Sequence, residues 1–313
     1  PRPSNGGPDG VVLLDKPVGL SSNIALQKVR RLFGSRKAGH TGSLDPLASG
    51  LLPICLGQAT RFSGYLLGAA KGYRVTGRLG ERTATGDVEG DVVERCPWEQ
   101  LGRDEFVTAL DGFHGPILQV PPMYSALKQG GERLYKKARR GEVVDRPARE
   151  VEIYDLELES WTPPSFALDV RCSKGTYIRT LVEDVARAAG SCAHVTALRR
   201  YAAGPYESES MYTLEALEAL AAESPERLAA VMLPMDSTVA GLPVVTLAAE
   251  VAHRLMQGQP VVLGPEGETG LVRVYSPAGF IGLGERSATG ELRVKRLLDT
   301  CTVELKASKI KDF

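Results

Sequence analysis

The sequence predicts an α+β protein, with a central sheet flanked by helices and a small β-barrel at the C-terminus. Three observations lead to this fold class. A chain of 313 residues with 43% hydrophobic side chains can form one large and one small domain. Segments of alternating apolar residues are interspersed with amphipathic helical segments as far as about residue 230. From about Gly241, short apolar stretches recur between Gly and Pro turns, as in a small barrel.

The first half of the chain begins with a Pro- and Gly-rich stretch, 1–9, that we expect to be a disordered tail. An apolar strand at 10–14 then leads into a turn. Ser21, Ser22 and Asn23 offer N-caps for a helix with one apolar face and one basic face. The pattern further predicts a strand at 52–56, a helix at about 58–67, a strand from 71, a polar turn at 82–87, a helix at about 103–110 and an extended passage at 117–122.

The second half is predicted in the same way. Alternation indicates paired strands at 151–158 and 166–172, then a helix from about 180 to 189, a strand at 194–201 and helices within 213–230. The barrel strands are expected at 244–247, 261–263, 271–275, 280–284 and 292–297, with one helix at about 247–257.

The segment 128–149 is the most basic part of the chain, with eight Lys or Arg residues against three acids. Glycines at 130, 131 and 141 bracket a short helix within it. A basic helix with glycine hinges could close over an anionic polymer. The alternative is a surface insertion that serves only solubility.

Bulk composition excludes some classes of protein. Lys plus Arg equals Asp plus Glu at 38, which argues against a polycation but allows a local RNA-binding face. Five scattered cysteines without a CxxC pair predict reduced thiols, a cytoplasmic protein and no structural zinc. No apolar run is long enough for a membrane span, and no phosphate-loop or dinucleotide motif is present. We therefore expect an enzyme or an RNA binder without cofactor or metal.

One carboxylate stands out, Asp45 in the stretch AGHTGSLDPLASGLLP at 38–53. Proline after it disfavours helical geometry, and leucines around it can anchor the loop on a core. An acid on a rigid loop suits a nucleophile or an acid–base group. Equally, Asp45 could simply cap a helix that starts at Pro46.

Several stretches together resemble the bacterial TruB family of tRNA pseudouridine synthases, in that family's order. They are 10–19 (GVVLLDKPVG), 38–53, 71–74 (KGYR), 82–90 (RTATGDVEG), 123–128 (MYSALK), 173–180 (SKGTYIRT) and 194–200 (HVTALRR). One departure is Ala197, where an aromatic residue is expected. The C-terminal part resembles the RNA-binding PUA domain that follows in this family.

The resemblance implies the pseudouridine synthase fold, with a mixed, largely antiparallel sheet in a catalytic domain at 10–238, a basic flap at about 123–150 and a PUA-like domain at 239–313. It implies that the T-loop uridine at position 55 of tRNA becomes pseudouridine, with no cofactor. The expected partner is the T-arm stem-loop, bound by a monomer that needs no protein partner and no membrane.

The resemblance also implies roles for single residues. Asp45 is the expected nucleophile, and Arg179 is expected to pair with it and lower the pKa of its carboxyl. Tyr73 should stack on the target base, with its hydroxyl available for late proton removal. Tyr177 and Leu198 should line the pocket, and His40 should fill the gap that the flipped uridine leaves. Expected wall or RNA contacts are Lys16, Lys128, Lys174, Arg199 and Arg200.

Without the resemblance, Tyr73, Tyr177, Leu198 and His40 would each more simply be structural. Two other functions also fit such a chain. One is an RNA-binding factor that helps tRNA fold on the same scaffold. The other is a subunit of a guide-RNA-directed pseudouridylation particle, against which the short N-terminus and the flap argue.

Overall fold

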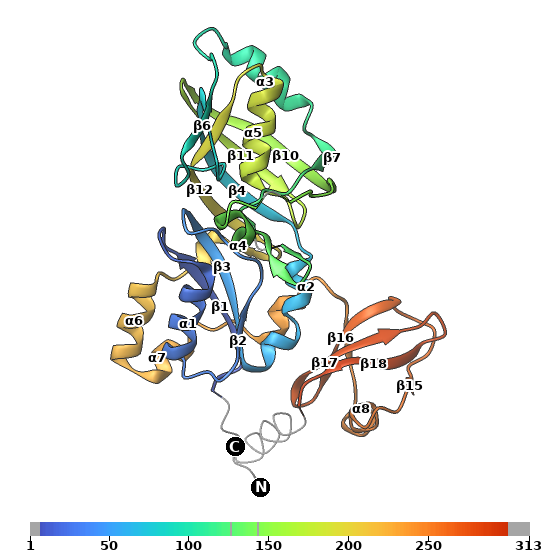
Figure 1. The fold of residues 1–313 in the computed structure, drawn as a ribbon. Helices are drawn as coiled ribbons and strands as arrows, with labels where there is room; N and C mark the ends of the chain where they lie inside the picture. The colour runs from blue at the N-terminus through green and yellow to red at the C-terminus, as the bar shows by residue number, and fades with distance from the viewer. Residues whose placement is uncertain (1–6, 126, 143, 300–313) are drawn as a thin grey trace.

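The computed structural model of the chain describes residues 7–125, 127–142 and 144–299. Two sheets organise it: a nine-stranded sheet that runs through the elongated main body and a five-stranded sheet beside its lower half (Figure 1). Residues 1–6 of the expected tail and 300–313 of the expected barrel domain lie outside the described residues.

The large sheet has the strand order β1-β3-β12-β4-β11-β10-β7, with β2 on β3 and β13 on β12. Only the β3–β12 pairing is parallel, so the prediction of a mixed, largely antiparallel sheet is confirmed. The strands are β1 (Gly10–Lys16), β2 (Ala38–His40), β3 (Ala48–Leu56), β4 (Lys71–Leu79), β7 (Gly115–Gln119), β10 (Arg149–Thr162), β11 (Ser165–Cys172), β12 (Ala193–Ala203) and β13 (Tyr206–Glu207).

Most helices of the main body cover one face of this sheet. The α5 helix lies against β12, α3 lies beside α5, and α6 packs on α1 in the lower half (Figure 1). Their apolar sides form one core with the strands, which includes Phe106, Phe166 and Val182. The α2 helix instead contributes Leu66 to a second core on the other face of β1 and β3. The helices of the main body are α1 (Ser22–Leu32), α2 (Ser63–Leu67), α3 (Arg103–Asp111), α5 (Ile178–Ala188), α6 (Leu214–Glu223) and α7 (Pro225–Ala229).

Local chemistry explains where these helices begin and end. The Ser21 hydroxyl caps α1 by accepting a hydrogen bond from the amide of Ile24. Thr213 and Ser224 cap α6 and α7 in the same way. The predicted single helix at 58–67 is instead a 3₁₀ turn, η1 (Gly57–Arg61), followed by α2. The Thr60 hydroxyl donates to the carbonyl of Gly57, and the Ser63 hydroxyl donates to that of Thr60, which favours this break.

The five-stranded sheet curls around α8 (Ala249–Met256) in the order β14-β16-β17-β18-β15. Its own core includes Leu255, Val272, Ile281 and Leu292. The strands are β14 (Val244–Thr246), β15 (Val261–Val262), β16 (Gly270–Ser276), β17 (Gly279–Arg286) and β18 (Glu291–Leu297), and η3 (Met235–Val239) precedes them. The predicted small β domain at the C-terminus is therefore present as a curled sheet.

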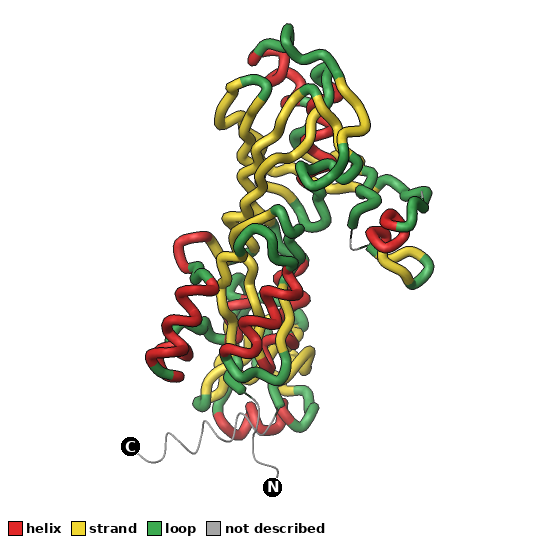
Figure 2. Tube along the Cα trace, turned by 60° about the vertical axis from the view of Figure 1, so that its left-hand side comes forward, coloured by secondary structure: helices red, strands yellow, loops and turns green. Residues whose placement is uncertain are grey.

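The basic segment leaves the main body between β7 and β10. It contains the hairpin β8 (Lys128–Gln129) and β9 (Glu132–Arg133) and the short helix α4 (Leu134–Arg139). Figure 2 shows these elements standing away from the sheet, at the right of the view. The short helix falls between the glycines, as the sequence predicts.

The prediction of reduced thiols is wrong for two cysteines. Cys96 and Cys192 form a disulfide, although 96 positions separate them in the chain. The hairpin of β5 (Glu81–Thr83) and β6 (Val92–Arg95) brings Cys96 to the start of β12. Cys55 and Cys172 are free and buried, and Cys301 lies outside the described residues.

Within the described ranges, no helix is both long and apolar enough to cross a membrane.

Gly50 allows β3 to approach β12 closely. Its φ is +98°, and a Cβ there would lie 2.2 Å from the carbonyl oxygen of Arg200. We expect Gly50→Ala to cost about 3 kcal/mol, because backbone strain and overlap add. Urea denaturation should show a clearly lower midpoint.

The control for this prediction is Gly64→Ala in α2, where an added Cβ meets nothing within 4 Å. That change should leave the midpoint equal or slightly higher, since Ala favours helix. Equal midpoints for the two variants would contradict the close approach at Gly50.

Candidate active site

The loop that carries Asp45 is fixed from both sides. The Leu44 amide donates to the Ser22 hydroxyl at 2.7 Å, and this hydroxyl donates to the Leu44 carbonyl at 2.9 Å. The amide of Gly19 donates to the carbonyl of Pro46. Leu44 and Leu47 are buried in the main core. Asp45 therefore lies in a rigid non-helical loop that turns directly into β3, and no helix begins at Pro46.

Arg179, in the first turn of α5, binds Asp45. The distance from its Nη2 to Oδ2 of Asp45 is 2.8 Å. Its Nη1 lies 3.2 Å from Oδ2 of Asp87 and donates to the carbonyl of Thr85, and its Nη2 also donates to the carbonyl of Tyr124. The Arg179 side chain is only 5% exposed, whereas that of Asp45 is 42% exposed. The guanidinium is thus a buried support for a carboxylate that remains accessible.

A cavity of about 430 Å³ opens beside this pair. Tyr73 from β4, Tyr177 at the start of α5 and Leu198 from β12 line it together with Asp45 and Arg179. One cavity therefore brings together five residues that the family resemblance singles out and that come from four separate stretches of the sequence. Aromatic and aliphatic walls beside a held carboxylate suit a flat, partly apolar ring such as a nucleobase.

Burial and the Arg179 guanidinium act in opposite directions on the pKa of Asp45. Arg179 lowers this pKa, as expected, through its positive charge and its hydrogen bond. Burial raises the pKa by more, and the nearby Asp87 carboxylate adds to the rise, so the net shift is above the usual range.

Two buried cations lie behind the cavity. Arg200 has no exposed surface, and its guanidinium donates to the carbonyls of Leu51 and Gly42. Lys16 is also fully buried, and its Nζ donates to the carbonyls of Pro17 and Leu20. Burial lowers the pKa of Lys16 to about 8. Both side chains brace loops. The expected RNA contact of Arg200 at the surface is therefore corrected, although Arg200 still lines the cavity. For Lys16, which is expected to serve the site wall through phosphate contact or packing, burial leaves the packing role.

The other predicted contacts lie at different places. Arg199 points to the opposite face of the sheet from the cavity and forms a two-pronged ion pair with Asp15. Lys174 is exposed, and Lys128 is on β8 with its side chain outside the description. His40 is half-buried on β2, and its Nδ1 is buried without a hydrogen-bond partner among the described residues. Burial and the charge of Arg200 lower the pKa of His40.

The structure adds residues that sequence reasoning missed. Asp87 lies in the stretch predicted only as a polar turn, yet it is the second carboxylate on Arg179. The buried Gln119 receives a hydrogen bond from the amide of Tyr177 and donates to its carbonyl, which fixes the start of α5. Lys71 also lines the cavity, and burial lowers its pKa to about 8. The matching stretches 82–90 and 71–74 contain Asp87 and Lys71 and are the only signals for these two residues, and no sequence signal points to Gln119.

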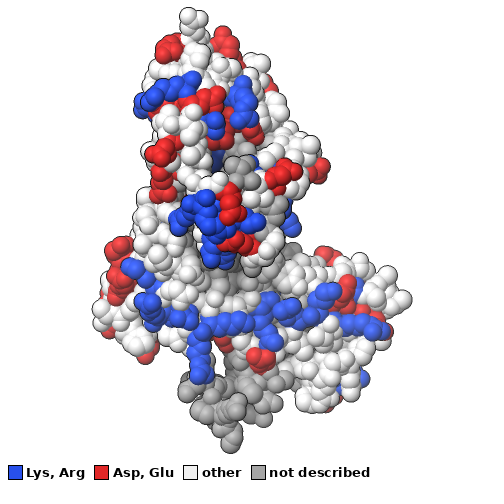
Figure 3. Space-filling model, in the orientation of Figure 1, with Lys and Arg blue, Asp and Glu red and all other residues white. Residues whose placement is uncertain are grey.

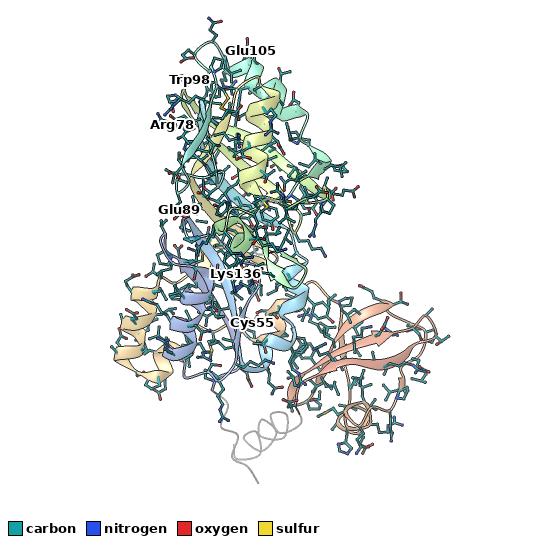
Figure 4. The ribbon with its side chains drawn as sticks, viewed as in Figure 1. Cys55, Arg78, Glu89, Trp98, Glu105 and Lys136 are labelled. Atoms are coloured by element: carbon teal, nitrogen blue, oxygen red, sulfur yellow. A yellow bond between two sulfur atoms is a disulfide. The ribbon has the colours of Figure 1, made fainter. Side chains whose placement is uncertain are left out.

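Basic side chains gather on one face of the molecule. Figure 3 shows them over α4 and in a band across the lower part of this face, from the region of α1 to the curled sheet. Lys136, labelled in Figure 4, belongs to α4. Exposed basic residues of the α1 region are Lys28, Arg31, Arg36 and Lys37. Such a face suits a phosphate backbone.

Over the described parts of the chain, no group of three or more His, Cys, Asp or Glu side chains is arranged to hold a metal ion.

Comparison with known proteins decides the family. The model of the TruB family pseudouridylate synthase N-terminal domain matches residues 30–178, and two TruB C-terminal models match 179–240 and 243–298. The tRNA pseudouridine synthase B of Sodalis glossinidius (strain morsitans) is 52% identical over an alignment of 305 residues that covers 95% of this chain and 98% of that protein. The chain belongs to the TruB family. Its members named above make pseudouridine in tRNA, and this chain is such an enzyme.

Other relatives agree with the TruB assignment. The tRNA pseudouridine synthase B of Pseudomonas aeruginosa (strain UCBPP-PA14) is 51% identical over 92% of this chain and 95% of that protein. Among solved structures, the crystal structure of a Cbf5–Nop10–Gar1 complex contains a chain with a TM-score of 0.70 and 26% identity, covering 95% of this chain and 90% of that one. The fold is thus the pseudouridine synthase fold followed by a curled, PUA-like sheet.

The pair of carboxylates on Arg179 predicts a pH effect. Because the Asp87 charge raises the pKa of Asp45, Asp87→Asn should lower that pKa. The Asp45 carboxylate becomes protonated as the pH falls through its pKa. With a lower pKa it stays ionised to lower pH, so the acid limb of the rate profile should move to lower pH. The plateau rate should also fall, by about tenfold, since Arg179 loses a buried partner.

Single-turnover pseudouridine formation between pH 4.5 and 8 measures both effects. The control is Glu159→Gln, which removes one of the two carboxylate partners of the exposed Arg74 and should leave the profile unchanged. An acid limb that stays in place in Asp87→Asn would rule out the electrostatic coupling.

Proposed function

We propose that this chain isomerises the T-loop uridine at position 55 of tRNA to pseudouridine, with Asp45 as the nucleophile. The observation that carries the proposal is the accessible Asp45 carboxylate, bound to the buried Arg179 at the wall of a base-sized cavity. In this reaction the N-glycosidic bond breaks, the base turns and a carbon–carbon bond forms at C5, with loss of the C5 proton. A carboxylate that bonds and later leaves divides this exchange into easier steps.

The other cavity residues are proposed to hold the base. Tyr73 stacks on it, and Tyr177 and Leu198 close the pocket. Burial raises the pKa of Tyr73, so its phenol is protonated in the free enzyme, and the charge of Arg200 opposes that shift. We propose that Arg200 assists Tyr73 when the C5 proton is removed. His40 is proposed to occupy the space of the flipped nucleotide, which offsets part of the cost of flipping.

The basic face is proposed to bind the T-arm. The segment 123–150 would close over the loop from one side, and the curled sheet within 239–313 would extend the contact. Lys174 and Lys128, which are neighbours in sequence of the cavity-lining Gly175 and Leu127, are candidate contacts. We propose a monomer that needs no guide RNA and no protein partner, although the similar chain of known structure comes from a Cbf5–Nop10–Gar1 complex.

The nucleophile is tested by tritium release from C5-labelled uridine in an unmodified T-arm stem-loop. The chain alone, without any cofactor, should release tritium, and Asp45→Asn should release none above background. A stem-loop with cytidine at position 55 and labelled uridine elsewhere should give no release. Equal release by both proteins would mean that another group is the nucleophile.

The same stem-loop separates the runner-up functions. Binding without release by the unchanged protein would favour the RNA-folding factor, for which the basic face alone suffices. Release only after addition of a guide RNA or partner proteins would favour the particle subunit.

The role of Arg179 is tested by Arg179→Lys. Lysine keeps the charge but cannot contact Asp45, Asp87 and two carbonyls at once with a planar fork. We expect the single-turnover rate to fall at least 100-fold, about 3 kcal/mol, while stem-loop affinity changes little. The control is Arg199→Lys at the exposed Asp15 pair, which should keep a nearly normal rate. A normal rate in Arg179→Lys would remove the planar guanidinium from the mechanism.

A further inference from the structure

The disulfide between Cys96 and Cys192 joins two segments at the end of the molecule remote from the C-terminal sheet. Trp98 and Arg78, labelled in Figure 4, lie in this upper region, far from the free Cys55. A cavity of about 470 Å³ is lined here by Cys96, Trp98, Arg78 and Arg95. Cys96 is half-buried, whereas Cys192 is buried. A small thiol reagent can therefore reach the disulfide from the Cys96 side.

The other described cysteines contrast with this pair. Cys55 and Cys172 are buried, and burial raises the pKa of their thiols to about 12 and about 11. Thiols of that kind are poor nucleophiles near neutral pH. The Cys96 cavity instead has a charge-balanced polar rim, in which Glu81 pairs with both Arg78 and Arg95, so a small polar thiol reagent can enter it. Within the described chain, thiol exchange is thus directed to one place.

The disulfide also lies at the base of the hairpin that reaches the active site. The Gly80 amide donates to the carbonyl of Cys192, and the Cys96 amide donates to that of Gly80. From Gly80 the chain runs through β5 into the turn with Thr85 and Asp87, both of which bind Arg179. This turn is held on β12 by two hydrogen bonds, one from the Val195 amide to the carbonyl of Gly86 and one from the Val88 amide to the carbonyl of Val195.

We propose that Cys96 and Cys192 form a reversible redox site that controls how firmly the 84–91 turn is held. A dithiol reductant supplies the chemistry: its thiolate attacks Sγ of Cys96, the sulfur–sulfur bond breaks, and Cys192 leaves as a thiolate and takes up a proton. The second thiol of the reductant then displaces Cys96 and completes the reductant's own disulfide. Two electrons and two protons pass to the protein, and a disulfide such as oxidised glutathione reverses the step.

When the disulfide is formed, we expect the hairpin to be held at both ends. The disulfide holds its base, and the hydrogen bonds to Val195 hold its turn. After reduction the backbone hydrogen bonds and the contacts of Thr85 and Asp87 with Arg179 remain, but the covalent link at the base of the hairpin is lost, so the turn opens locally more often. In a reducing compartment, disulfides that do form are mostly transient or redox-sensing, which fits a responsive site rather than a permanent one. This inference does not depend on position 55 or on the roles proposed for Asp45 and Tyr73.

The experiment compares one protein in two redox states, so no folding-sensitive variant is needed for the main result. The full chain with Cys301→Ser, which removes a cysteine outside the described residues, is treated with oxidised glutathione or with dithiothreitol. Alkylation and peptide mass spectrometry should find Cys96 and Cys192 blocked after oxidation and alkylated after reduction. Hydrogen–deuterium exchange in the 84–91 peptide should be at least threefold faster in the reduced state.

The matched control adds Cys96→Ser and Cys192→Ser to the same chain. Its 84–91 peptide should exchange at the fast rate in both reagents. If oxidised glutathione leaves Cys96 and Cys192 open to alkylation, the redox site is refuted. If the disulfide forms but exchange at 84–91 is equal in both states, its control of the turn is refuted.

Discussion

A buried guanidinium is costly unless each of its donors finds an acceptor, and Arg179 meets this demand with groups from three separate segments. Asp45 comes from the loop at 38–53, Thr85 and Asp87 come from one turn, and Tyr124 comes from the start of the flap at 123–150. None of these segments forms a strand of the large sheet at its contact point. Their positions relative to one another depend on the charge that they surround.

The strand β12 makes that arrangement possible, because it joins the two halves of the sheet. It pairs in parallel with β3, which follows the Asp45 loop, and antiparallel with β4, which carries Tyr73. Leu198 and Arg200 face the cavity, while Arg199 between them faces the opposite side. One strand thus sets the distance between the carboxylate loop and the aromatic wall, and the close contact at Gly50 leaves little room for adjustment.

Sequence periodicity predicts the strands and most helices well, because apolar spacing reports burial directly. The family resemblance locates the loop of Asp45 and the start of α5. Neither the periodicity nor the resemblance predicts three features of the structure. These are the break within the predicted helix at 58–67, the disulfide between Cys96 and Cys192, and the contact of Asp87 with Arg179 across 92 positions. Each depends on long-range geometry or on local hydroxyl contacts rather than on periodicity. The burial of basic residues is equally hard to predict from the sequence. Lys16 and Arg200 are fully buried, and only the three-dimensional structure shows this.

Two of the acceptors around Arg179 are main-chain carbonyls, those of Thr85 and Tyr124. Any amino acid supplies a carbonyl, so natural selection can preserve these contacts while the side chains at both positions drift. A comparison of side chains alone does not reveal that these two carbonyls bind Arg179. Changes in loop length or backbone path there would be far more harmful than substitutions. Grafting a basic segment from a relative into this enzyme should therefore be judged by where its backbone runs, not by how many residues match.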